Sequence, residues 1–413
     1  MKVLLSFVMG AALVSYAALN IQQGAEPWAP KIMNMCLNPA NNDVSGNLRV
    51  AYTGLSNTLD RIICLYVNFN QQPLHDLLGA PLIRLMMGAF GTTYAIMAFE
   101  GSRKGFKNTT LLAAFPLFGL LANFVGIFSV FPLLWVPLDL YYKNKKKNTS
   151  DWNITLPEAY GTLAGIVLGY GIPSAILASP LVKDDSRFEQ DFICVWIVLP
   201  IIIVPLISFC IRYFKNQGSA IDNIRDPALK ERLYVAEGKD ALERSFLFLG
   251  VLNMLNYFVN FWIVGQKGIR IWDSILLLLG APGNLPADLT FGDLGQLLGT
   301  RTLLIDYIAL IVAFILWAVF SSGIFAGIIV TLLTPIVGPA AAISFYAYYR
   351  ENKIQNIVSA DPEAEKAAAA ASIISSSADS EAKKAAAAAD AAADAAAVAA
   401  AASIVSSSTS KKK

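Results

Sequence analysis

Apolar residues in this chain occur in long, nearly uninterrupted runs, separated by short polar loops. A bilayer core about 30 Å thick needs about 20 consecutive apolar residues per helix, so runs of this length predict membrane-spanning helices. The chain is therefore predicted to be an all-α, polytopic transmembrane helical bundle of seven to eight spans. The candidate spans are 3–19, 80–99, 111–136, 160–181, 192–212, 246–265, 303–322 and 324–346.

Two further apolar segments, 58–69 and 271–279, are too short to cross a bilayer. The first follows a reasonable helix start at Asn57, and the second is stopped by the Gly-Ala-Pro-Gly run that begins at Gly280. We interpret both as interfacial or re-entrant helices packed on the bundle.

The predicted organisation has three parts. Residues 1–20 are a signal anchor or a signal peptide, and the poor cleavage site around Leu19 favours a retained anchor. Residues 21–350 form the transmembrane bundle. Residues 355–413 are a low-complexity tail of Ala, Ser and Lys without aromatic residues, which cannot build a core.

Composition excludes several function classes. Hydrophobic residues make up 55 % of the chain and charged residues only 15 %, and the net charge of +2 argues against a nucleic-acid partner. The single histidine, His75, and four cysteines without a C-x-x-C pair argue against a metal site. No phosphate-binding loop and no aspartate-rich diphosphate motif occurs, so no cofactor is expected.

Basic residues give a first prediction of topology. Loops 137–158 and 212–245 are the most basic, which places them in the cytosol under the positive-inside rule, with the loop that carries Arg103 on the other side. Three sequons are candidate glycosylation sites, at Asn108, Asn148 and Asn153, and two of them fall in the first of these basic loops. We give the charge distribution more weight than the sequons, because sequons arise often by chance.

Three carboxylic acids are candidate catalytic residues: Asp60, Glu100 and Asp306. An ionisable side chain inside the bilayer is expensive and by default faces the bundle interior. Asp306 lies one turn into the seventh run, where desolvation would keep its proton; the alternative is an interfacial Asp paired with Arg301. Asp60 begins an amphipathic segment and Glu100 ends the second span, positions at which a solvated charge is the simpler explanation.

Polar and aromatic residues within the spans are candidate substrate-binding residues. Asn253, Asn256 and Asn260 share one helical face, with Tyr257 beside them, so they form either the wall of a cavity or an interhelical hydrogen-bonding seam. Trp135 ends an aromatic third span, whose rings either stabilise a cation or provide lipid-facing bulk.

A set of loose motifs carries a family resemblance over residues 1–350. The motifs are Cys36-Leu37-Asn38-Pro39, Thr58-Leu59-Asp60-Arg61-Ile62-Ile63-Cys64, Glu100, Phe115-Pro116-Leu117-Phe118-Gly119 and Val130-Phe131-Pro132-Leu133-Leu134-Trp135. Together they resemble polytopic membrane proteins of filamentous fungi that are encoded with terpenoid and meroterpenoid biosynthesis. Some of those proteins are membrane-bound terpene cyclases of ascochlorin and indole-diterpene pathways.

The resemblance implies a metal-independent cyclase of the lyase or isomerase type in secondary metabolism. Its acid would protonate an epoxide or olefin of a lipophilic terpenoid substrate, and aromatic faces would stabilise the cation as rings close. Asp60 and Glu100 lie within the resembling stretches, so the resemblance favours them as the acid, whereas the residues by themselves favour Asp306. The expected location is the membrane of the endoplasmic reticulum. The alternatives are a small-molecule transporter, against which the lack of a detectable inverted repeat argues, and a non-enzymatic scaffold for other pathway enzymes.

Overall fold

The computed structural model describes residues 1–37, 51–107, 110–145, 152–182, 185–280 and 289–358. The regular elements among these residues are all helices, with no strand. This confirms the predicted all-α membrane bundle. Six helical stretches are long and apolar enough to cross a membrane. They are Lys2–Ala25 (α1), Gly79–Ser102 (α4), Leu156–Leu177 (α8, Leu156–Ile166, to α9, Ile172–Leu177), Ser186–Asn216 (α10), Pro227–Gln266 (α11) and Gly292–Ser322 (within α13, Phe291–Ser322).

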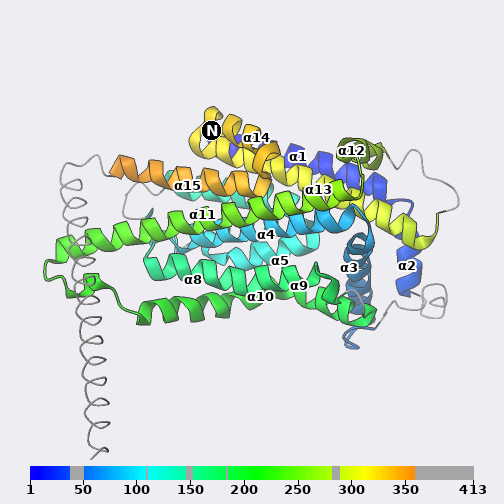
Figure 1. The fold of residues 1–413 in the computed structure, drawn as a ribbon, viewed down its shortest axis with the longest axis horizontal. Coiled ribbons are helices and arrows are strands. Elements are labelled where there is room, and N and C mark those ends of the chain that lie inside the picture. Colours follow the sequence, from blue (N-terminus) through cyan, green and yellow to red (C-terminus); the bar gives the residue numbers. More distant parts are fainter. Residues whose placement is uncertain (38–50, 108–109, 146–151, 183–184, 281–288, 359–413) are drawn as a thin grey trace, which may run out of the picture. The chain divides into compact units, whose positions relative to one another are not determined.

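Residues 1–220 and 234–354 form one compact unit with two distinguishable ends. At one end, a Cys36–Cys64 disulfide ties α2 (Ala29–Leu37) to α3 (Asn57–His75), which lies across the direction of α4 and α11 in Figure 1. We call this the disulfide end. The other end, where α4 finishes at Ser102, we call the basic end. Residues 221–233 belong to a second unit, in which Lys230 Nζ donates to the Asp222 carbonyl (3.0 Å).

The predicted third span does not cross the bundle. It begins at the basic end, where Leu112 contacts Gly101, and runs inward as η2 (Leu111–Ala114) and α5 (Phe115–Val125). At Gly126 (φ +85°) the chain reverses and returns through α6 (Ile127–Val130), a π-helical turn (Phe131–Trp135) and α7 (Val136–Lys145). In the last turn of α7, Lys143 pairs with Glu100 at the basic end, with 3.3 Å between Nζ and Oε2. Residues 111–145 are therefore a re-entrant hairpin, the first hairpin.

The predicted eighth span is also folded back. Two helices, α14 (Ile324–Val337) and α15 (Pro339–Val358), meet at Gly338 (φ +88°). At the far end of α15, Glu351 pairs with Arg103 of the basic end. Residues 324–354 form the second hairpin. Both reversals need backbone conformations that are nearly restricted to glycine, which a count of apolar residues cannot reveal.

The first hairpin also changes the predicted topology. The Lys104 backbone N–H donates to the Asn153 carbonyl (2.8 Å), and Arg103 Nη1 donates to the Trp152 carbonyl (2.8 Å). The loop that follows α4 thus lies on the same side as residues 152–158, whereas the sequence placed these loops on opposite sides. The correction follows because the chain between these two loops, the first hairpin, enters and leaves the bundle at the same end.

The two short apolar segments outside the spans are helices, as predicted. Residues 58–69 lie within α3, and 271–279 lie within α12 (Ile271–Gly280). The predicted tail, 355–413, lies almost entirely outside the described residues.

Candidate functional site

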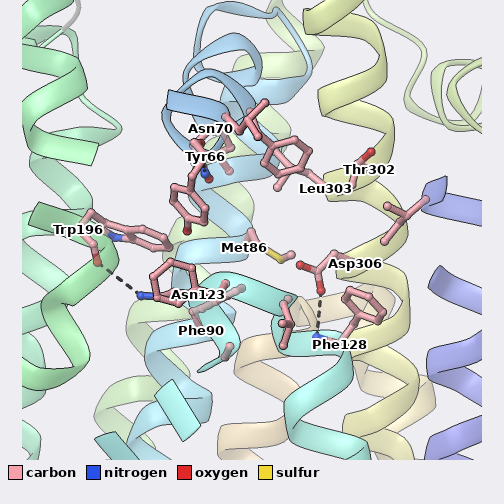
Figure 2. Close-up of a pocket in the computed structure, with 18 of the residues that line it drawn as sticks. Tyr66, Asn70, Met86, Phe90, Asn123, Phe128, Trp196, Thr302, Leu303 and Asp306 are labelled. Carbon is pink, nitrogen blue, oxygen red and sulfur yellow. Dashed lines mark hydrogen bonds between the residues drawn. The ribbon is translucent and has the colours of Figure 1, made fainter. Parts of the chain in front are cut away.

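A cavity of about 550 Å³ lies at the tip of the first hairpin, with α3 across its disulfide end (Figure 2). Its walls come from α1, α3, α4, the first hairpin, α10 and α13. They are mainly apolar, which suits a lipophilic ligand of small-molecule size. Six aromatic side chains line it: Tyr66, Phe69, Phe90, Phe124, Phe128 and Trp196.

Asp306 is the one carboxylic acid among the described residues that line this cavity. It is 9 % exposed and lies midway along α13. Its Oδ1 accepts a hydrogen bond from the Phe128 backbone N–H (3.1 Å), and Figure 2 shows the carboxyl directed toward the cavity between Met86 and Phe128. No salt bridge to Asp306 occurs within the described part of the chain.

The position of this hydrogen bond follows from the reversal at Gly126. A helix that starts afresh inside the bundle has N–H groups without intrahelical acceptors, and each must be satisfied in a dry environment. Asp306 satisfies the Phe128 N–H with one oxygen and leaves the other available. A Cβ at position 126 would lie 3.6 Å from Asp306 Oδ2 and 2.4 Å from the Phe128 ring, so glycine also allows this close approach.

Asn123, on α5, is held rigidly at the opposite wall. Its Nδ2 donates to the Ile197 carbonyl (2.7 Å), and its Oδ1 accepts from the Tyr94 hydroxyl (2.7 Å). Its hydrogen-bonding capacity is thus used mainly to fix the first hairpin against α4 and α10.

Glu100 lies elsewhere, in a buried cluster of charges at the basic end that we call the ion cluster. Arg103 binds both of its oxygens through Nε (2.9 Å) and Nη2 (3.1 Å), and Lys143 and Arg350 also pair with it. Three carboxylates and three cations balance each other in the cluster: Glu100, Asp139, Glu351, Arg103, Lys143 and Arg350. Such pairing holds Glu100 as a carboxylate and leaves it no proton to give.

Asp60 lies near the N-terminus of α3 and anchors the segment before it. It accepts from the Thr53 hydroxyl (2.6 Å), the Thr53 N–H (2.7 Å) and the Gly54 N–H (3.1 Å). The Thr53 hydroxyl, followed by the backbone N–H groups, lowers the pKa of Asp60 below its ordinary value. This carboxyl is therefore ionised at neutral pH.

Asn253, Asn256 and Asn260, the asparagine stripe, face α4, as an inward orientation requires. Among the described residues, no hydrogen bond joins them to Asp60, Glu100 or Asp306. Asn253 Nδ2 donates to the Thr92 hydroxyl (2.9 Å), and Asn256 Nδ2 donates to the Arg84 carbonyl (3.0 Å). Asn260 Oδ1 accepts from Arg84 Nη1 (3.3 Å). These bonds tie α11 to α4.

A second cavity, of about 280 Å³, lies at the tip of the second hairpin and is almost wholly apolar. Tyr257 and Asn260 line it, and the Tyr257 hydroxyl donates to the Pro335 carbonyl (3.0 Å). Two of the predicted substrate-binding residues thus face this cavity, while the predicted acid Asp306 faces the first.

Trp135 is fully buried in the first hairpin. Its ring stacks on Phe131 (centroids 5.1 Å apart, 11° between planes) and contacts Trp317. It is not among the residues that line either cavity. Of the three sequons, Asn108 and Asn148 lie outside the described residues, and Asn153 is half-buried at the basic end.

Sequence reasoning missed Tyr66, Asn70 and Trp196 as cavity residues. Tyr66 and Asn70 come from α3 and Trp196 comes from α10. In either helix, the sequence does not show whether such a side chain lines a cavity, packs on a neighbouring helix or contacts lipid. Within the described chain, no group of three or more His, Cys, Asp or Glu side chains could hold a metal ion.

Comparison with known proteins gave one match. Residues 1–266 match the family model described as the CtvD domain, which is consistent with a fungal biosynthetic-cluster protein. The matched region contains all the described residues that line the first cavity except Thr302, Leu303 and Asp306, which belong to α13. No curated protein and no solved structure matches the chain.

Proposed function

The chain belongs to the CtvD-domain family, and on that premise we propose that it is a membrane-bound terpene cyclase of a meroterpenoid pathway, with Asp306 as the acid that starts the reaction. One observation carries the proposal. A single carboxyl group, without a counter-ion among the described residues, faces a lipophilic cavity with aromatic walls.

The residues divide the chemistry between them. Phe128 N–H binds Asp306 Oδ1, so Oδ2 is free to carry a proton toward the cavity. That proton passes to the oxygen of a terminal epoxide, the C–O bond breaks with its electron pair on oxygen, and a tertiary cation forms. Neighbouring double bonds attack in turn, while the faces of Phe90, Phe124 and Trp196 stabilise the positive charge. The last cation loses a proton to water, and the Asp306 carboxylate takes up a proton from water before the next turnover, so product and substrate are isomers.

The environments of the other two candidate acids support this assignment. Asp60 is ionised by its three hydrogen bonds, and Glu100 is ionised by its three cations. A general acid must hold a proton at the working pH, and only the apolar setting of Asp306 favours the neutral form among these three. We therefore assign Asp60 and Glu100 structural roles.

The first helix supports the view that residues 1–20 are retained as an anchor. Ala18 lines the cavity together with Ile21 and Gln22, and Arg301 Nη1 donates to the Asn20 carbonyl (2.7 Å). Removal of residues 1–20 would open the cavity and leave the buried Arg301 without this acceptor.

We also propose an orientation in the endoplasmic reticulum membrane. A disulfide requires an oxidising compartment, and the basic loops favour the cytosol, so the disulfide end faces the lumen. The disulfide and the basic loop after α4 lie at opposite ends of α4, so they predict the same orientation. In this orientation Asn153 faces the cytosol and is not glycosylated.

The proposed function is tested by the Asp306→Asn variant, expressed in a fungal host and supplied with a phenol that carries a farnesyl chain with a terminal epoxide. Loss of the acid should lower the cyclisation rate by about 100-fold or more, measured by product analysis of isolated membranes. Asp293→Asn, an exposed carboxyl on the same helix, is the matched control and should retain activity. Normal product formation by Asp306→Asn would rule the proposal out.

A transporter is the second candidate, because discontinuous helices with tips inside the bundle are typical of transporters. In an inverted-repeat transporter, however, the two hairpins enter from opposite sides, whereas both hairpins here enter from the basic end. Uptake of the same labelled substrate into sealed vesicles, without its conversion, would support transport over cyclisation. A scaffold predicts neither uptake nor an effect of Asp306→Asn.

A further inference from the structure

Tyr66 is the second side chain with an acidic proton that reaches the first cavity. It comes from α3, on the disulfide side, and Figure 2 shows its hydroxyl pointing into the space that Asp306 also faces. Its ring contacts Phe124 at the tip of the first hairpin (centroids 6.0 Å apart). The position of the phenol is thus set by two separate elements.

The phenol is a donor in this setting. Burial raises the pKa of Tyr66, so the hydroxyl keeps its proton at any physiological pH. Asn70 Nδ2, one turn further along α3, donates to the Tyr66 backbone carbonyl (2.9 Å). The protonated phenol can therefore donate its O–H to a group inside the cavity.

Two other polar side chains of the cavity, Asn123 and Thr302, are engaged within the protein. Asn123 bonds to Ile197 and Tyr94, and the Thr302 hydroxyl donates to the Leu298 carbonyl (2.9 Å). An O–H donor exposed in an apolar cavity and facing a carboxyl across it is suited to an oxygen atom of a bound ligand.

We propose that Tyr66 is a second catalytic residue, whose hydroxyl donates a hydrogen bond to the substrate oxygen that Asp306 protonates. This inference rests on the proposed cyclase function. As the epoxide C–O bond breaks, negative charge develops on that oxygen, and a fixed donor stabilises it more in the transition state than in the ground state. The transferred proton comes from Asp306 Oδ2, and Tyr66 keeps its own.

The Tyr66→Phe variant tests this inference, because it keeps the ring and its contact with Phe124 and removes only the hydroxyl. With the epoxyfarnesyl phenol as substrate, kcat should fall by about 100-fold while KM changes little, since the donor acts mainly in the transition state. Tyr307→Phe is the matched control: Tyr307 is also buried and adjoins Asp306 in sequence, but it lines the second cavity. Its kcat and KM should match the wild type.

A second variant protects the test against a folding defect. Difluorotyrosine incorporated at position 66 has a more acidic phenol and should raise kcat, whereas a purely structural role would leave kcat unchanged. Wild-type kcat in Tyr66→Phe, together with an inactive Asp306→Asn, would overturn the role of Tyr66 and leave the cyclase proposal standing. Full activity of Asp306→Asn would instead remove the cyclase proposal itself.

Discussion

Two buried carboxylic acids in this protein, Asp306 and Glu100, have opposite surroundings. Glu100 is completely buried but has three cations around it, from the loop after α4, from α7 and from α15. Asp306 is nearly as buried but has one backbone N–H and an apolar cavity. Burial by itself therefore does not identify a catalytic acid; the presence or absence of a compensating charge distinguishes them.

The ion cluster holds the bases of both hairpins. Lys143 belongs to the first hairpin, and Arg350 and Glu351 belong to the second, while Glu100 ends the transmembrane helix α4 between them. Asp306, in contrast, binds only the tip of the first hairpin. We infer that the ion cluster stabilises the fold, and that the tip of the first hairpin positions Asp306, the residue proposed as the acid.

The largest loss of stability is expected from Glu100→Gln. Loss of this charge leaves the buried cations of the cluster with one carboxylate too few, and breaking a buried ion pair in this way costs about 3–5 kcal/mol. The variant should show a much lower thermal unfolding temperature in detergent and poor recovery of folded protein. Unfolding at the wild-type temperature would show that the cluster does not hold the hairpins.

An intermediate effect is expected from Gly126→Ala. The positive φ at this position costs about 1–3 kcal/mol for a residue with a Cβ, and the added methyl would collide with the Phe128 ring. Gly323→Ala is the control, since Gly323 also has a positive φ but no atom near its Cβ position. Thermal unfolding should fall further in Gly126→Ala than in Gly323→Ala, and cyclisation should fall only in Gly126→Ala. Equal decreases of the unfolding temperature in both variants would mean that the contact between position 126 and the Phe128 ring does not affect stability.

The smallest effect on stability is expected from Asp306→Asn. An amide oxygen can still accept from the Phe128 N–H, and no ion pair is broken within the described residues, so the free energy of unfolding should change by less than about 1 kcal/mol. This is the opposite of Glu100→Gln, where stability falls first. A loss of several kcal/mol would contradict the comparison and indicate that the carboxylate of Asp306 is a structural cap.

Much of the fold could be predicted from the order of apolar runs. The six long spans, the two short helices and the inward direction of the asparagine stripe follow from the length of each run and from the cost of burying amides in hydrocarbon. The two hairpins could not be predicted in this way. An apolar run of 26 residues satisfies the requirement for a span whether it continues straight or reverses at Gly126.

The candidate site, like the fold, could be predicted only in part from the sequence. Sequence alone marked Asp306 as an expensive group inside an apolar helix, because hydropathy and charge are properties of single residues and their near neighbours. Tertiary structure decided which acid meets a cavity and which meets cations, since Glu100 and Arg350 are separated by 250 residues and Asp306 and Phe128 by 178. Electrostatic environment depends on distances in space, and here the reversals at Gly126 and Gly338 set those distances.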